Sequence, residues 1–239
     1  MAGATAERTE LVSGPLGTVL GFVVEWFPLV IVAFLWELAS GWAVGESVLP
    51  PPSIVLTRVV DMLVTGDVLP DLLLSVYRVA WGLGLSIVVG VLLGIGMARS
   101  DTVEDFFEVF LALLYPVPKT ALVPLALLWL GRGTETAILI IFLACLLPII
   151  LNSYNAARTV DQNLIWSAQM MGTSDRKILW KIVVPDTIPD IVTGIRQAIP
   201  IAFIALTGAE LIGASDGMGA IILTSGQLGT YPRMFAAIV

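Results

Sequence analysis

Four ionisable residues lie inside otherwise apolar stretches of this 239-residue chain: Arg78, Lys119, Arg196 and Glu210. A charged side chain within a membrane span costs about 2.5–3.5 kcal/mol on insertion scales unless it reaches water or a partner. The four residues are therefore candidates for the wall of a solute pathway, in which the cations would favour an anionic substrate. Structural ion pairs are the alternative, although Arg196 and Glu210 are about four helical turns apart and too distant to pair with each other.

Other kinds of site are excluded by the residue types. The chain has no His and one Cys, which rules out a Cys/His zinc site, a Ser-His-Asp triad and a disulfide framework. It has no G-x-x-x-x-G-K-[ST] loop to hold the phosphates of ATP. The net charge of −7, without a basic run, argues against a nucleic-acid partner. We expect no catalytic, cofactor-binding or metal site.

The composition indicates a membrane protein. Hydrophobic residues make up 57% of the chain and charged residues only 13%, against roughly 25% in soluble domains. Because a helical span needs about 20 apolar residues, five or six spans nearly use up the length. We expect an all-α polytopic helical bundle over residues 18–239, after a cytoplasmic N-terminal tail over residues 1–17. The clearest spans are 18–42, 72–98, 106–130, 134–157 and 188–213.

Two of these spans have special features. Gly90 and Gly94 are spaced to let another helix approach the second span closely. The third span is interrupted by prolines, with Lys119 at the break. Prolines leave backbone carbonyls without helical partners, which is tolerable only against protein or a water-filled cavity. This break predicts either a lining position for Lys119 or a kink for packing. A short amphipathic helix is also expected over residues 53–63.

The stretch 164–185 lies between two apolar segments and is mixed in character. We expect Gly172 to divide it into two short helical pieces. Thr173 or Ser174 can cap the second piece, and Asp175 suits its first turn. Pro185 is expected to end that piece, because a proline ring excludes the preceding residue from helical geometry. The stretch has the character of a surface loop that contacts something outside the membrane.

This stretch resembles the cytoplasmic "EAA" loop of ABC-transporter permeases of the binding-protein-dependent importer type. Ala168, Gly172, Ile182 and Pro185 match the family pattern at the right spacing, and Val184 replaces the usual Leu. Two further positions depart from it: Ser167 stands for Ala, and Trp166 stands where Glu is usual. Blocks such as LPPPS at 49–53, SVYRVAWGLGLS at 75–86 and AELIGASDGMG at 209–219 resemble the sulfonate, nitrate and taurine branch.

The resemblance implies a type I importer permease fold and a two-fold dimer, homomeric or heteromeric, in the bacterial inner membrane. It implies ATP-binding cassette ATPase subunits that bind the ATP and contact residues 164–185, the coupling segment. It also implies a solute-binding protein that delivers a small, anionic solute. Six Lys/Arg fall on the inner side and three on the outer side if the N-terminus is cytoplasmic, which supports that orientation. The alternative is a secondary transporter driven by an ion gradient, whose inverted repeats are not evident.

Overall fold

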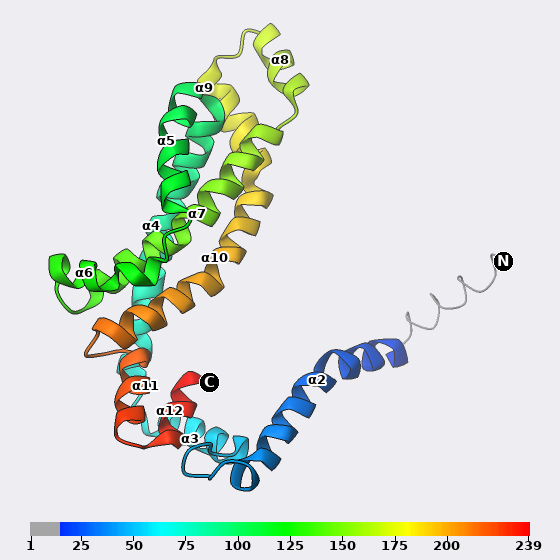
Figure 1. The fold of residues 1–239 in the computed structure, drawn as a ribbon. Coiled ribbons are helices and arrows are strands. Elements are labelled where there is room, and N and C mark those ends of the chain that lie inside the picture. The colour runs from blue at the N-terminus through cyan, green and yellow to red at the C-terminus, as the bar shows by residue number, and fades with distance from the viewer. Residues whose placement is uncertain (1–14) are drawn as a thin grey trace. The chain divides into compact units, whose positions relative to one another are not determined.

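The structure, a computed structural model, describes residues 15–239, with side chains from Trp26 onward. The predicted N-terminal tail, residues 1–17, lies outside the described residues except for its last three, which begin helix α2. The described chain is mainly helical and contains no β-strand, as expected. Figure 1 traces its helices: α2 (Pro15–Trp42), α3 (Pro52–Thr65), α4 (Leu69–Arg99), α5 (Asp101–Leu114), α6 (Val123–Leu130), α7 (Thr134–Thr159), α8 (Gln162–Met170), α9 (Asp175–Ile178), α10 (Val184–Gly213), α11 (Met218–Gln227) and α12 (Tyr231–Ile238).

The chain divides into two compact units. The smaller unit contains the described residues up to Thr65 and the segment Ser225–Val239, and the larger unit is Gly66–Thr224.

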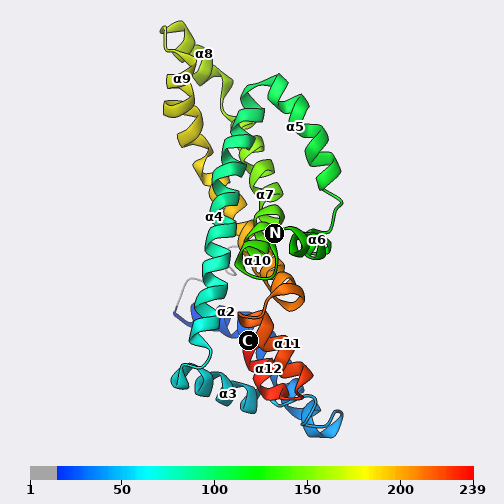
Figure 2. The ribbon, with the colours of Figure 1, turned by 90° about the vertical axis from the view of Figure 1, so that its left-hand side faces the viewer.

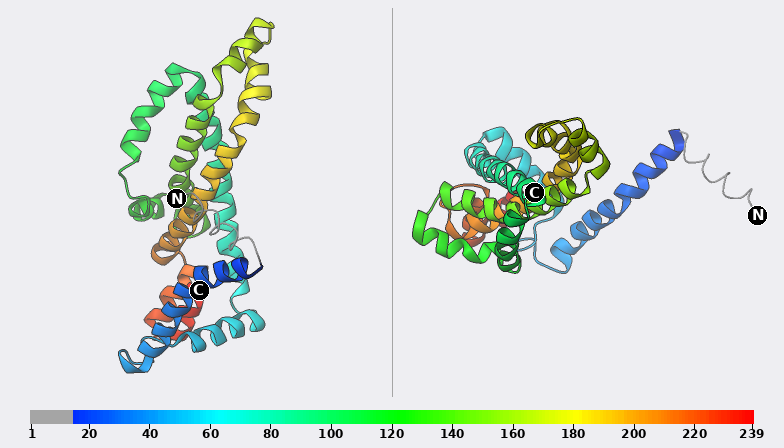
Figure 3. Two further views of the ribbon diagram at one scale, coloured as in Figure 1. Left: turned by 90° about the vertical axis from the view of Figure 1, so that its right-hand side faces the viewer. Right: turned by 90° about the horizontal axis from the view of Figure 1, so that it is seen from above.

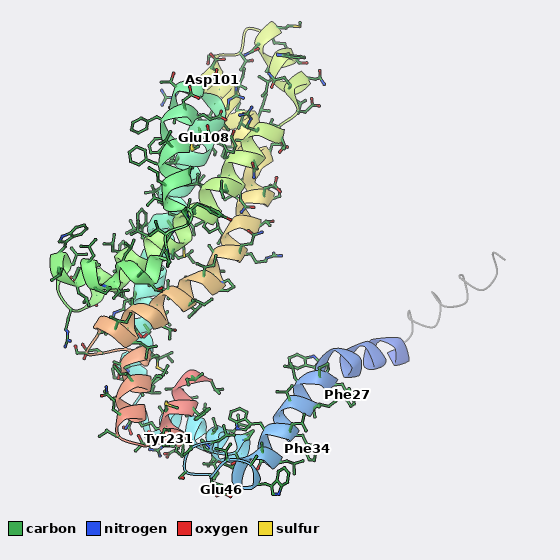
Figure 4. The ribbon with its side chains drawn as sticks, in the orientation of Figure 1. Phe27, Phe34, Glu46, Asp101, Glu108 and Tyr231 are labelled. Carbon is green, nitrogen blue, oxygen red and sulfur yellow. The ribbon has the colours of Figure 1, made fainter. Side chains whose placement is uncertain are left out.

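In the smaller unit, α12 packs on α3, and Trp36 of α2 lies against Phe235 with ring centroids 5.8 Å apart. Helix α3 confirms the amphipathic helix expected over residues 53–63. Glu37 accepts hydrogen bonds from the backbone N–H (3.1 Å) and the hydroxyl (2.7 Å) of Ser53, and so satisfies a free donor in the first turn of α3. The side chains of Phe27 and Phe34, labelled in Figure 4, project from α2 and are exposed.

The core of the larger unit is formed by three long helices. Helices α4 and α10 pack on α7, with a smaller contact between α4 and α10 (Figure 2). The close approach expected at Gly90 and Gly94 is confirmed. A Cβ atom at Gly94 would lie 2.6 Å from the carbonyl oxygen of Ile150, and one at Gly90 would lie 2.8 Å from Ile149. The glycines thus let the backbone of α4 approach α7 more closely than larger side chains would allow.

The third expected span is broken, as its prolines predict. Helix α5 ends at Leu114, a 3₁₀ turn covers Lys119–Leu122, and the two parts are bent by 86°. Ser100 alone separates α4 from α5, because Asp101 already begins α5. Asp101 and Glu104 lie in the first turn of that helix, where acidic side chains interact favourably with the helix dipole.

Three helices of the described chain are long and apolar enough to cross a membrane: Leu69–Arg99, Thr134–Thr159 and the continuous Asp175–Gly213. The bent pair α5 and α6 would make a fourth. The first expected span, 18–42, coincides with α2, of which the shorter stretch Trp26–Trp42 is apolar. The described helices therefore agree with the expected all-α polytopic bundle.

Candidate functional site

Helix α8 (Gln162–Met170) contains the first part of the stretch 164–185, and Gly172 follows shortly after its end. Its N-terminus is capped by Asp161, whose carboxylate accepts a hydrogen bond from the backbone N–H of Asn163 (2.9 Å). At its C-terminus, the N–H of Thr173 donates to the carbonyl of Ala168 (3.0 Å) and that of Gly172 to the carbonyl of Gln169 (2.9 Å). These two bonds form a Schellman motif, in which Gly172 adopts a φ of +75°. The expected division of the stretch at Gly172 follows from this geometry.

The second piece does not end where the sequence predicted. Helix α9 continues through a π-helical turn, Leu179–Val183, directly into α10. Pro185 occupies the first turn of α10, where its missing N–H costs little. The π turn shifts the hydrogen-bond register, since Val184 N–H donates to the carbonyl of Leu179, five residues back. The prediction that Pro185 ends the helix was wrong because this wider turn accommodates the ring.

Capping of the second piece also differs in detail from the expectation. Ser174 is the N-cap residue by backbone geometry, but its side chain makes no capping hydrogen bond. Asp175 lies in the first turn as predicted. The 39 residues from Asp175 to Gly213 form one continuous helix, called the rod below, with a contour length of about 60 Å at 1.5 Å per residue.

The stretch is anchored to the ends of the long helices. Ile165 and Ala168 of α8, with Ile178 and Val183 of the following segment, are buried in one apolar cluster. The same cluster contains Ile95 of α4 together with Ala157 and Val160 at the end of α7. Figures 1 and 2 show α8 and α9 together at one end of the three-helix core. The stretch is consequently packed against the ends of α4 and α7 and is not a free loop.

Its outer surface carries large apolar side chains. Met170 is 89% exposed, Met171 78% and Trp166 54%. On a surface that faces water, a group of large exposed apolar side chains typically marks a contact site. Sequence reasoning singled out Trp166 but not the two methionines, whose position just before the turn glycine was the available signal.

The seven residues predicted for coupling separate into two groups. Trp166, Ser167, Gly172 and Pro185 are exposed, whereas Ala168 is buried and Ile182 and Val184 are half-buried within the cluster that holds the stretch in place. The buried anchors Ile165, Ile178 and Val183 were not predicted. The separation of Ile178 and Val183 by five residues reflects the π turn between them.

Two of the four predicted pathway residues meet inside the larger unit. Arg78 Nη1 donates to Glu210 Oε1 at 2.7 Å, and the two side chains are 1% and 0% exposed. Arg78 also donates to the backbone carbonyl of Asp216 (2.8 Å) and to the hydroxyl of Thr134 (3.4 Å). Each charge is therefore paired and hydrogen-bonded, as burial requires.

The same pair organises the turn between α10 and α11. Glu210 accepts hydrogen bonds from the hydroxyl of Ser75 (2.8 Å) and from the backbone N–H of Gly219 (2.8 Å). The N–H of Met218 donates to Ser75, and that of Gly217 donates to Asp71. These side chains satisfy backbone donors at the start of α11. The network accordingly ties the first half of α4 to the end of α10.

Lys119 and Arg196 lie elsewhere. The ammonium group of Lys119 donates to the carbonyls of Leu114, Val117 (2.8 Å) and Tyr115 (3.5 Å), which belong to the proline-containing break. Lys119 also lines a cavity of about 300 Å³ with residues of α7 and α10. Arg196 is exposed on α10. The structure therefore does not bring the four residues together at one site.

A second cavity, of about 340 Å³, lies between α5 and α7 and shares Tyr115 and Leu147 with the first. Glu104 and Glu108 line it, and Figure 4 shows Glu108 on α5 together with Asp101. Glu104 is paired with Arg158 (2.7 Å) and bonded to the hydroxyl of Tyr154, both on α7. Among the described residues, no group of three or more His, Cys, Asp or Glu side chains is placed to hold a metal ion.

Comparison with known proteins identifies the class. Residues 86–239 match the family described as the binding-protein-dependent transport system inner membrane component, and the chain belongs to that family. It is therefore a permease subunit of an ABC-type, binding-protein-dependent importer, and a multi-pass inner-membrane protein. The family as a whole works with ATPase and binding-protein partners.

Individual relatives agree with this assignment. The chain is 32% identical over 213 residues to a Bacillus subtilis protein named as the aliphatic sulfonates transport permease SsuC, covering 89% of this chain and 77% of the relative. It is 30% identical to the taurine transport system permease TauC of Escherichia coli, covering 83% and 74%. The fold resembles that of the MetNI methionine ABC transporter in an inward-facing conformation, with a TM-score of 0.62, 16% identity and coverage of 71% and 85%.

Proposed function

We propose that this permease conducts a small anionic solute of the sulfonate, nitrate or taurine type, and that residues 164–185 couple its movement to a separate ATPase. The names of the relatives SsuC and TauC support the substrate class. The cation of Lys119 at the wall of a cavity is compatible with an anion, although its donors already bind carbonyls. We propose the cavities beside α7 as part of the pathway.

One observation carries the coupling role. The exposed surface of α8, with Trp166 and the two methionines, is joined through the turn at Gly172 to the rod Asp175–Gly213. A force applied to α8 would reach the membrane interior through this rod, because no flexible loop intervenes between α9 and α10. The buried cluster around Ile165 and Ile178 supports transmission by holding the segment rigid.

The remaining parts of the proposal concern partners and orientation. The N-terminus and the coupling segment are proposed to face the cytoplasm, where the ATPase binds ATP. A second permease chain, identical or homologous, would complete the pathway, and a solute-binding protein would deliver the solute from the other side. The chain itself is proposed to bind no cofactor and to hydrolyse no ATP.

The test is reconstitution with candidate partners. The chain is co-expressed with an ATP-binding cassette ATPase and a binding protein, purified through a tag on the permease, and placed in liposomes. We expect the ATPase to co-purify and labelled taurine or an alkanesulfonate to enter only when ATP and the binding protein are present. Uptake driven by an ion gradient without ATP, or the absence of any co-purifying ATPase, would contradict the proposal.

A further inference from the structure

A narrow apolar groove lies between α4 and the start of the rod, at the end of the larger unit that carries the coupling segment. Its volume is about 220 Å³, and Leu92, Ile95, Leu179 and Val184 are among the side chains that line it. Arg99 and Trp180 complete its wall. The π turn Leu179–Val183 forms one side, where the wider turn displaces the rod from regular α geometry.

The groove changes from apolar to cationic along its length. On α4, Leu92 and Arg99 lie two turns apart on one face, about 10 Å along the axis. On the opposite wall, Trp180 and Val184 line the groove on the two sides of the π turn, and Lys177 lies about one helical turn before Trp180. Figure 3 (left) shows that α4 runs toward the coupling segment and that α10 runs away from it. Arg99 is the last residue of α4 and Lys177 belongs to α9, so both lie at this end of the larger unit.

Arg99 and the indole N–H of Trp180 lie at the cationic end of the groove, which is called its mouth below. Both groups are free to bind a ligand. Arg99 is exposed and has no hydrogen-bond or ion-pair partner among the described residues, unlike Arg58, Arg78 and Arg158, which pair with acids. The indole N–H of Trp180 is likewise without a partner in the described chain, and the residue is 60% exposed. A tryptophan whose ring contacts apolar groups and whose N–H reaches polar ones is typical of the lipid–water boundary.

We propose that this groove binds one anionic phospholipid. The acyl chain lies along Leu92, Ile95 and Val184, the ring of Trp180 lies at the level of the ester groups, and the phosphate rests against Arg99 with Lys177 as the second cation. Basic pockets between membrane helices recognise anionic headgroups in this way. The charge of the mouth selects an anionic lipid over a zwitterionic one. The bound lipid would contact α4 and the base of the coupling segment at once.

The site is tested with the full chain in phosphatidylcholine nanodiscs that contain a small fraction of phosphatidylglycerol brominated near the headgroup end of its acyl chains. Bromine quenches tryptophan fluorescence on contact. We expect stronger quenching than with the same fraction of brominated phosphatidylcholine, and we expect the excess to disappear in Trp180→Phe. Equal quenching by the two lipids, or an excess that persists in Trp180→Phe, would overturn the proposal.

Charge variants supply the matched comparison. Arg99→Gln and Lys177→Gln should each raise the phosphatidylglycerol fraction for half-maximal excess quenching about fivefold. Arg132→Gln removes an exposed cation from the turn between α6 and α7 and should leave it unchanged. Native mass spectrometry should show less retained phosphatidylglycerol for Arg99→Gln, a readout independent of Trp180. If inorganic phosphate abolished the excess quenching, the site would be one for a free anion and the lipid proposal would fail.

Discussion

Arg78 and Glu210 form a 2.7 Å ion pair across 132 residues of sequence, and both side chains are almost completely buried. The pair connects α4 with the end of α10 and, through Gly219, with the start of α11. Burying two charges is costly, and only mutual attraction together with further hydrogen bonds offsets that cost. The pair is therefore a structural connection within the larger unit.

The first prediction follows from this burial. Arg78→Met or Glu210→Met alone should lower the free energy of unfolding by about 3–5 kcal/mol, because each leaves an uncompensated buried charge. The double variant should lose clearly less than the sum of the single losses. Thermal or denaturant unfolding of the purified protein in detergent measures the three values. Strictly additive losses would show that the two side chains are not coupled.

The second prediction concerns the contact between α4 and α7. Gly94→Ala would place a Cβ atom 2.6 Å from the Ile150 carbonyl and 2.9 Å from the Tyr154 nitrogen, and backbone atoms cannot easily move aside. We expect a loss of about 1–3 kcal/mol in unfolding free energy. Gly84 has no neighbour within 4 Å of such an atom, so Gly84→Ala should be neutral or stabilise the helix by about 1 kcal/mol. Equal effects of the two substitutions would contradict the packing described for α4.

The third prediction concerns the break between α5 and α6. Lys119→Met removes the donor for the carbonyls of Leu114, Tyr115 and Val117, and should destabilise the protein by about 1–3 kcal/mol. Lys119→Arg keeps a cation with several donors and should retain most of the stability. The free energies of unfolding of the two variants and the parent are compared in detergent. A Lys119→Met protein as stable as the parent would mean that water, and not Lys119, satisfies these carbonyls.

The fourth prediction concerns the turn of the coupling segment. A Cβ atom added at Gly172 would meet no neighbour within 4 Å, but the residue has a φ of +75°. Substitutions at this position therefore differ in the backbone strain that they cause. Gly172→Val should strain the turn by about 1–2 kcal/mol and uncouple ATP hydrolysis from uptake, with assembly largely intact. Gly172→Asn, which tolerates this conformation, should keep most of the uptake. ATP hydrolysis and solute uptake are measured in the same liposomes, and unchanged uptake by Gly172→Val would count against the lever role.

Local sequence patterns predicted the long helices well. The spans expected at 72–98, 134–157 and 188–213 correspond to α4, α7 and α10, because a long apolar run has few alternatives in a membrane. The break in the third span followed from its prolines, and the division at Gly172 from the freedom of glycine to adopt a positive φ.

Local patterns could not predict two kinds of feature. One depends on contacts between residues far apart in the chain, and the other on the shape of a single turn. Nothing near Arg78 in the sequence indicates that Glu210 is its partner, since the contact is created by the packing of α4 against α10. Pro185 normally marks a boundary, and the π turn before it is a tertiary adjustment without a sequence signature of its own. The anchoring role of Ile178 and Val183 depends on that same turn.

The most direct test of the coupling role is a photo-crosslinking residue placed at Met170, the most exposed large apolar side chain before the turn. The full transporter is irradiated with the ATPase bound, and the crosslinked product is identified by mass. Leu128 on α6, which is similarly exposed, serves as the control position. We expect a crosslink to the ATPase from position 170 and none from position 128. A crosslink to the ATPase from position 128 alone, or crosslinks from position 170 only to lipid or to the binding protein, would contradict it.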